Sequence, residues 1–266
     1  MKIIVSHDVD HLFRNDHYKD LTYPKLWIRS TAEFIKREYG TKEWLRRMCS
    51  PIYRKQNYIF DVTEFDRQYQ VPSTFFFGME KGLGMSYEYS SVKDIAKQVE
   101  DAGFDIGVHG ISFEHFPAMK KEYDRFLQIT SRKNFGIRIH YVRFAQNTFS
   151  GLERCGYLFD STEFDKEKGY LIKEPYKVGQ MWEFPLTIMD GYLPKKIEDK
   201  KLRTLDIVEK ARKQSLSYLT LLFHDCYFCD AYIAEKEWYK WIIQWFDDNG
   251  YEFISYRDAI SELEKK

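Results

Sequence analysis

The chain has 266 residues, of which 44% are hydrophobic, and its 41 basic and 41 acidic residues give a formal net charge of zero. This length and apolar content suffice for one large core, so we expect residues 1–266 to form a single α/β domain. Zero net charge gives no electrostatic case for a nucleic-acid partner, and no apolar stretch approaches the roughly 18 residues of a membrane span. The chain opens on a strand pattern rather than a secretion signal, which predicts a cytoplasmic protein.

Short apolar runs alternate with helical patterns along the sequence. The apolar runs predict strands at 2–8, 73–77, 104–109, 137–144, 182–187, 218–224 and 252–255. Helical spacing predicts helices at 25–38, 59–69, 91–102, 118–133, 203–216 and 235–249. Strands joined by helices over short connections indicate parallel strands with right-handed crossovers, and roughly seven such units favour a TIM-like barrel over an open sheet.

The first predicted strand ends in a polar cluster, Ser6-His7-Asp8-Val9-Asp10-His11. In α/β sheets this end of a strand is where ligands bind. Asp8 and Asp10 project to the same side of an extended segment, so one carboxylate can bind a metal while the other activates a water on it. A polar turn in which the two acids cap a helix is the alternative interpretation.

Residues 12–58 interrupt the alternation between the first and second strands, and we expect a helical insertion there. The segment is rich in aromatic and basic residues, namely Trp27, Arg29, Lys36, Arg37, Trp44, Arg46, Arg47, Tyr53, Arg54 and Lys55. Because it follows the carboxyl end of a strand, it would lie over the mouth of a barrel. It is either a lid that binds an anionic or extended glycan, or a helical pair whose tryptophans pack on the barrel.

Three later strands also end in titratable residues. His109 follows the strand at 104–109, with His115 on the loop beyond it, and imidazoles at such a position favour a zinc-like metal site. Arg143 could pair with a carboxylate, and His224 follows the apolar run Leu221-Leu222-Phe223 in a position suited to a general acid.

Cys226 and Cys229 form a single Cys-x-x-Cys pair. A structural zinc site needs two more ligands at a second short spacing, so we expect ordinary reduced thiols near a cleft, with a redox pair as the alternative.

The order of these motifs resembles the polysaccharide deacetylase (NodB-homology, carbohydrate esterase 4) superfamily. The resemblance covers residues 2 to about 255 apart from the insertion. It is carried by Asp8-Val9-Asp10, Gly107-Val108-His109, Tyr141-Val142-Arg143-Phe144 and Leu221-Leu222-Phe223-His224-Asp225. The segments 136–144, 156–162 and 184–191 are similar to the divergent branch associated with surface-polysaccharide biosynthesis.

This resemblance implies a distorted (β/α)7 barrel with one divalent metal ion, held by an aspartate and two histidines. It makes Asp8 the catalytic base, Asp10 a metal ligand and His109 the first metal histidine. It also makes Arg143 the residue that orients the base, and His224 the general acid.

The second metal histidine of the family pattern falls on Phe113 in this sequence. We therefore expect His115 to serve as that ligand, with His140 or a water as the alternative. Asp225 and Trp182 are further candidates for substrate binding or as an alternative ligand.

The activity implied is metal-dependent removal of N-acetyl groups from amino sugars of a polysaccharide or glycan precursor by amide hydrolysis. Zinc is the first expectation for the metal, with cobalt, nickel or manganese as alternatives. Two other functions stay open. The first is that of a non-catalytic carbohydrate-binding relative with a degraded metal site, and the second is hydrolysis of a non-sugar C–N amide bond.

Overall fold

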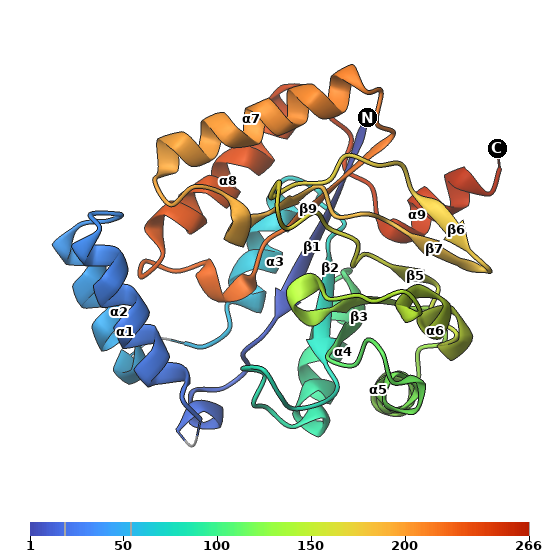
Figure 1. Cartoon of the computed structure of the whole chain (residues 1–266), viewed down its shortest axis with the longest axis horizontal. Coiled ribbons are helices and arrows are strands. Elements are labelled where there is room, and N and C mark those ends of the chain that lie inside the picture. Colours follow the sequence, from blue (N-terminus) through green and yellow to red (C-terminus); the bar gives the residue numbers. More distant parts are fainter. Residues whose placement is uncertain (19, 54, 266) are drawn as a thin grey trace.

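The computed structural model describes residues 1–18, 20–53 and 55–265, which form an α/β protein built on one curled sheet (Figure 1). Its strands are β1 (Lys2–Val9), β2 (Thr74–Gly78), β3 (Asp105–Gly110), β4 (Gly136–Ile139), β5 (Phe159–Asp160), β6 (Tyr176–Val178), β7 (Met181–Glu183), β8 (Ile188–Met189) and β9 (Tyr218–Leu222). Its α-helices are α1 (Thr22–Ile35), α2 (Thr41–Tyr53), α3 (Ile59–Gln68), α4 (Val92–Asp101), α5 (Phe116–Thr130), α6 (Thr148–Cys155), α7 (Ile197–Lys213), α8 (Ile233–Asp248) and α9 (Tyr256–Leu263).

The sheet has the strand order β6-β7-β5-β4-β3-β2-β1-β9-β8 and curls into a half-barrel with β1 near its middle. All neighbouring pairs are parallel except β6–β7. The α/β class and the parallel pairing predicted from the sequence are therefore confirmed. The strict alternation of a (β/α)7 barrel is not followed, because β5 to β8 succeed one another without an α-helix in the described residues.

Residues of β1 alternate between the two faces of the sheet, as the period of two requires. Ile3, Val5 and Val9 belong to the large core between the sheet and its covering helices. Ile4 belongs to a second cluster, together with Phe76, Phe159, Phe184 and Tyr256. Ser6, Asp8 and Asp10 therefore share the face of Ile4, and this inner face carries the polar groups of the site.

The inner cluster fills the half-barrel below these polar groups. Its aromatic rings pack against the sheet backbone where a glycine has no side chain. A Cβ at Gly136, for example, would lie 2.2 Å from the Phe159 ring. Helix α9 contributes Tyr256, Ala259 and Ile260 to the same cluster. The inside of the half-barrel is thus a packed core, above which the polar groups at the carboxyl ends of the strands lie.

Several predicted elements differ from the observed ones near strand ends. Strand β4 ends at Ile139, because a 3-10 turn (His140–Val142) with a positive φ at Tyr141 redirects the chain. The predicted strand at 182–187 is shortened by Pro185, and 252–255 makes only a single bridge, from Phe253 to Ile3. Helices α6 and α9 were not predicted, and α6 is short and contains Gly151, which weakens its helical pattern.

The insertion forms the antiparallel hairpin α1–α2, which stands beside the half-barrel (Figure 1). Its tryptophans pack within the hairpin: Trp44 stacks on Phe34 at 5.2 Å, and Trp27 donates a hydrogen bond to the Met48 carbonyl. Arg47 fastens the hairpin to the rest of the protein through the Ala231 carbonyl at 2.8 Å. Arg54 lies outside the described residues. No helix in the described ranges is long and apolar enough to cross a bilayer.

Candidate metal centre and active site

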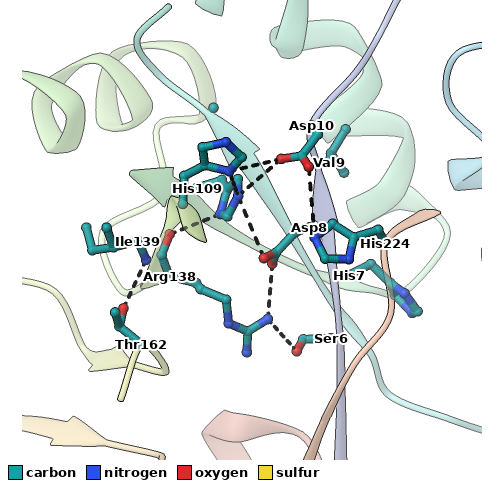
Figure 2. A network of polar contacts seen from close by, with 12 residues as sticks. Ser6, His7, Asp8, Val9, Asp10, His109, Arg138, Ile139, Thr162 and His224 are labelled. Atoms are coloured by element: carbon teal, nitrogen blue, oxygen red, sulfur yellow. Dashed lines mark hydrogen bonds and ion pairs between the residues drawn. The ribbon is translucent and has the colours of Figure 1, made fainter. Parts of the chain in front are cut away.

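The carboxyl ends of β1, β3, β4 and β9 meet at one edge of the sheet, where five predicted side chains come together (Figure 2). Asp8 lies on β1 and Asp10 directly after it, His109 lies on β3, His140 follows β4 and His224 follows β9. Parallel strands place residues that are far apart in sequence side by side, which is why this edge collects them.

Each of two histidines uses one ring nitrogen to bond a backbone carbonyl. His109 Nδ1 lies 3.1 Å from the Arg138 carbonyl, and His140 Nε2 lies 3.2 Å from the Leu83 carbonyl. A carbonyl only accepts, so these nitrogens carry the hydrogens. The remaining nitrogens, His109 Nε2 and His140 Nδ1, therefore carry lone pairs in the neutral rings. Such bonds fix the tautomer of metal-binding histidines.

These two lone pairs and Asp10 Oδ1 point at one another. The nitrogens are 2.9 Å apart, and they lie 3.3 and 3.2 Å from the carboxylate oxygen. Asp10 Oδ1 is buried and receives no hydrogen bond within the described part of the chain. Ligands about 2.1 Å from a tetrahedral zinc lie about 3.4 Å from one another, close to these separations. The group Asp10, His109 and His140 therefore fits a divalent metal ion.

The charge state of Asp10 suits this role. Burial would raise its pKa, but the charge of His140, the close approach of the His109 and His140 rings, and the charge of His224 hold the pKa well below its usual range. The carboxylate is therefore ionised at neutral pH and can bind a cation.

A strained turn places His140 in this group. The two residues after it, Tyr141 and Val142, have φ angles of 59° and 43°. A positive φ is unfavourable for a β-branched residue and is found where the surrounding structure requires it. The Tyr141 ring packs 3.9 Å from the His140 ring, and its hydroxyl bonds the same Leu83 carbonyl that His140 bonds. The turn thus orients the imidazole through the packing of the Tyr141 ring and through the Leu83 carbonyl that both residues bond.

Asp8 faces a buried arginine. Arg138 donates all five of its N–H groups, to the Ser161 carbonyl, the hydroxyls of Ser6, Ser161 and Tyr256, and Asp8 Oδ1 at 3.0 Å. The guanidinium is fully buried, and Asp8 supplies the negative charge that it requires there. The second oxygen of Asp8 lies 3.7 Å from His109 Nε2, beside the candidate metal position.

His224 is held by Asp190. Its Nδ1 lies 2.8 Å from Asp190 Oδ1, and its backbone N–H donates to Asp190 Oδ2 at 2.8 Å. Burial would lower the pKa of His224, but the charge and hydrogen bond of Asp190, with Asp10 and Asp8 nearby, raise it to about 10. Since Nδ1 is occupied, Nε2 is the nitrogen that faces the site, 3.8 Å from Asp10 Oδ2.

A cleft of about 510 Å³ opens beside these groups. Asp10, Asp190 and Tyr141 line its inner end, and Thr22 and Arg29 of the hairpin line another part of its wall. This volume lies in the range of small-molecule sites. The hairpin therefore contributes to the wall of the cleft, as the lid interpretation requires. Its tryptophans, Trp27 and Trp44, are not among the residues that line the cleft.

The structure does not bring His115 or Arg143 to this group. His115 is exposed at the N-cap of α5, and His140 occupies the position expected for it. Arg143 bonds the Ile111 and His140 carbonyls and lies over the ring of Phe113, so Arg138 is the arginine that contacts Asp8. Both differences arise beyond the ends of β3 and β4, where turn geometry rather than strand periodicity directs the side chains.

The two remaining candidates also lie apart from the metal ligands. Asp225 accepts a hydrogen bond from the Tyr58 amide at the start of α3, and burial raises its pKa to about 7. Trp182 packs against the inner aromatic cluster, with Lys177 5.3 Å from its ring centre. Cys226 and Cys229 are buried and form no disulfide in the described part of the chain, as expected for reduced thiols, and Cys226 lines the cleft.

Sequence reasoning missed the roles of Arg138 and Asp190. Each had a usable signal, because Arg138 alternates with apolar residues on a short strand and Asp190 directly follows the apolar pair of β8. A charged residue on the inner face of a packed half-barrel needs an oppositely charged or hydrogen-bonding partner. Asp8 was the available partner for Arg138, and His224 was the available partner for Asp190.

No protein-family model and no curated protein matches the sequence. Among solved structures, a Mycobacterium smegmatis protein classed as a polysaccharide deacetylase has a TM-score of 0.64 at 14% identity, covering 99% of this chain and 90% of that one. A GH57 branching enzyme from Thermococcus kodakaraensis has a TM-score of 0.55 at 10% identity, with 98% and 71% covered. A Bordetella bronchiseptica protein classed as an O-antigen polysaccharide deacetylase has a TM-score of 0.44 at 13% identity, with 85% and 72% covered. At these identities the likeness concerns the fold alone, and the fold of the Mycobacterium smegmatis structure is the one that the motif order led us to expect.

Proposed function

We propose that the protein is a metal-dependent deacetylase that removes N-acetyl groups from amino sugars of a polysaccharide or glycan precursor by amide hydrolysis. The observation that carries this proposal is the convergence of three ligand atoms, from Asp10, His109 and His140, between Asp8 and His224 at the inner end of a cleft. A metal site flanked by one basic and one acidic group is what hydrolysis of an amide requires.

Asp10, His109 and His140 would hold one divalent ion, and two imidazoles with one carboxylate suit zinc. Such an ion would polarise the acetyl carbonyl and lower the pKa of a bound water to about 7. His115 has no part in this proposal, because it lies exposed on α5.

Asp8 is the proposed base, which takes the proton from the attacking water at its Oδ2. Arg138 holds Oδ1 of the same carboxylate at 3.0 Å, so the free oxygen is directed toward the site. The five bonds of the guanidinium keep it from turning. In this assignment Arg138 takes the orienting role that the motif order gave to Arg143.

His224 is the proposed acid, which gives the Nε2 proton to the departing sugar amine. Asp190 holds Nδ1 and stabilises the charged ring, so that a proton is available at Nε2 near neutral pH. The exposed ring of Tyr141, 58% accessible at the inner end of the cleft, offers an apolar surface for the sugar ring.

The direct test is acetate release from N-acetylglucosamine oligosaccharides by zinc-loaded protein, with Asp8→Asn and His224→Gln as inactive variants and His115→Ala as the matched control. We expect the wild type and His115→Ala to release acetate and the other two to lose it while they keep the metal. Binding of the oligosaccharides without acetate release by any of them would favour the non-catalytic alternative instead.

A further inference from the structure

The α1–α2 hairpin has an outer surface that no other described part of the chain covers. Among the described residues, fifteen large hydrophobic side chains are exposed, and eight of them lie in segment 12–58. The five on the two helices and their ends that define this surface are Leu21 (65% exposed), Ile28 (73%), Ile35 (73%), Leu45 (50%) and Ile52 (75%). We refer to these five residues as the outer apolar face.

The spacing of these residues puts them on one side of the hairpin. Leu21, Ile28 and Ile35 are seven residues apart, as are Leu45 and Ile52, and residues seven apart share a helix face. Ile28 stands two residues before the buried Ser30, and Ile52 stands two residues after the buried Ser50. Two residues turn a helix by about 200°, so both rows point away from the protein.

The hairpin does not need this face for its own packing. Its two helices are joined by the Phe34–Trp44 stack and by the hydrogen bond from Trp27 to the Met48 carbonyl. The outer apolar face is therefore available to a partner. Figure 1 shows the hairpin standing away from the helices that cover the sheet.

Basic residues outnumber acidic residues in the segment that carries this face. Segment 12–58 holds eleven Lys and Arg residues but five Asp and Glu, while the whole chain has 41 of each. The only acids within α1 and α2 are Glu33 and Glu43, and both are turned inward, 3.0 and 2.5 Å from Arg47. Lys36 and Lys42 are exposed. The outward side thus combines aliphatic and basic groups without exposed acids from either helix.

We infer that the outer apolar face docks on an anionic lipid bilayer surface. Aliphatic residues that enter the headgroup region, flanked by lysines that attract anionic lipids, are the pattern of interfacial helices. A second copy of the chain fits less well, since pairing two such faces would bring their basic rims together. The opposite side of the hairpin lines the cleft, so docking would hold the cleft at the bilayer surface.

Co-sedimentation of the full chain with vesicles tests this inference, whether or not the protein is a deacetylase. We expect binding to phosphatidylglycerol–phosphatidylcholine vesicles and little binding to phosphatidylcholine alone. Ile28→Ser with Ile52→Ser should lower the partition coefficient about tenfold, and Lys36→Glu with Lys42→Glu should lower it by about as much. The matched controls are Leu202→Ser and Lys213→Glu, two exposed residues of α7, which should leave binding unchanged.

Two results would overturn the inference. One is the absence of binding to anionic vesicles by wild-type protein whose circular dichroism shows that it is folded. The other is a concentration-dependent dimer in light scattering that Ile28→Ser abolishes, because that result would assign the face to a second copy.

Discussion

His7 and His224 each bond an aspartate inside the protein, but they use their rings differently. His7 lies on the outer face of β1, where Nε2 is 3.0 Å from Asp66 and Nδ1 is 2.9 Å from the Phe223 carbonyl. His224 bonds Asp190 through Nδ1 and turns Nε2 toward the site. Both ring nitrogens of His7 therefore bond groups inside the protein, whereas Nε2 of His224 faces the other groups of the site.

The two partner carboxylates, Asp66 and Asp190, also differ in the groups that they bond. Asp66 is fully buried and also accepts hydrogen bonds from the Tyr239 and Ser73 hydroxyls, both at 2.6 Å, so it joins α3, α8 and the segment before β2. Within the described residues, both carboxylate oxygens of Asp190 bond His224. A buried His–Asp pair is therefore not by itself a sign of function. The sign is a ring nitrogen directed toward the other polar groups of the site.

The largest expected effect is the loss of activity when the His224–Asp190 pair is altered at His224. His224→Gln should lower kcat by about 10²- to 10⁴-fold, because the leaving amine loses its proton donor, while the metal content stays unchanged. Acetate release and metal analysis of the same preparation measure both quantities. Full activity of His224→Gln would remove His224 from the proposed mechanism.

The reverse effect is expected at the His7 pair. Asp66→Ala leaves three buried donors without an acceptor and should reduce the free energy of unfolding by about 3–5 kcal/mol. The activity of the molecules that remain folded should change little. Urea denaturation with parallel assays checks this, and a variant as stable as wild type would show that the network is not structural.

A smaller effect is expected when the orienting carboxylate of the other pair is neutralised. Asp190→Asn removes the negative charge that raises the pKa of His224, so this pKa should fall toward its ordinary value. We expect the alkaline limb of the kcat/KM profile to move to lower pH and kcat to drop about tenfold. A profile identical to that of wild type would show that Asp190 does not control His224.

The smallest effect concerns stability against pH in chelator-treated protein. His224 has a pKa of about 10 in the folded state, above its ordinary value of about 6.5, so it binds its proton more tightly when folded. Its stabilisation is fully present below about pH 6.5 and is lost as pH rises through about 10. Between these limits the Tm of wild type should fall a few degrees further than that of His224→Gln. Parallel Tm curves would contradict the pairing with Asp190.

The sequence predicted the strands well where periodicity and burial decide the structure. The alternation in β1 correctly put Asp8 and Asp10 on one side, and the apolar runs before His109 and His224 located the ends of β3 and β9. These features follow from local pattern, because buried parallel strands read as continuous apolar runs.

Residues beyond the strand ends could not be placed in this way. Whether His115 or His140 approaches Asp10 depends on the turn at Tyr141 and on the loop that Glu122 holds through the Ile111 and Ser112 amides. Likewise, β4 ends at Ile139, so Arg138 and not Arg143 stays in the sheet and reaches Asp8. Such outcomes depend on long-range packing, which spacing in the sequence does not contain.

Metal content tests the central claim most directly. Protein purified without chelator and reloaded with zinc should hold about one equivalent in the wild type and in His115→Ala, and should lose it in His140→Ala. This result would establish the ligand group Asp10, His109 and His140. Retention of metal in His140→Ala together with its loss in His115→Ala would contradict the arrangement described for the site.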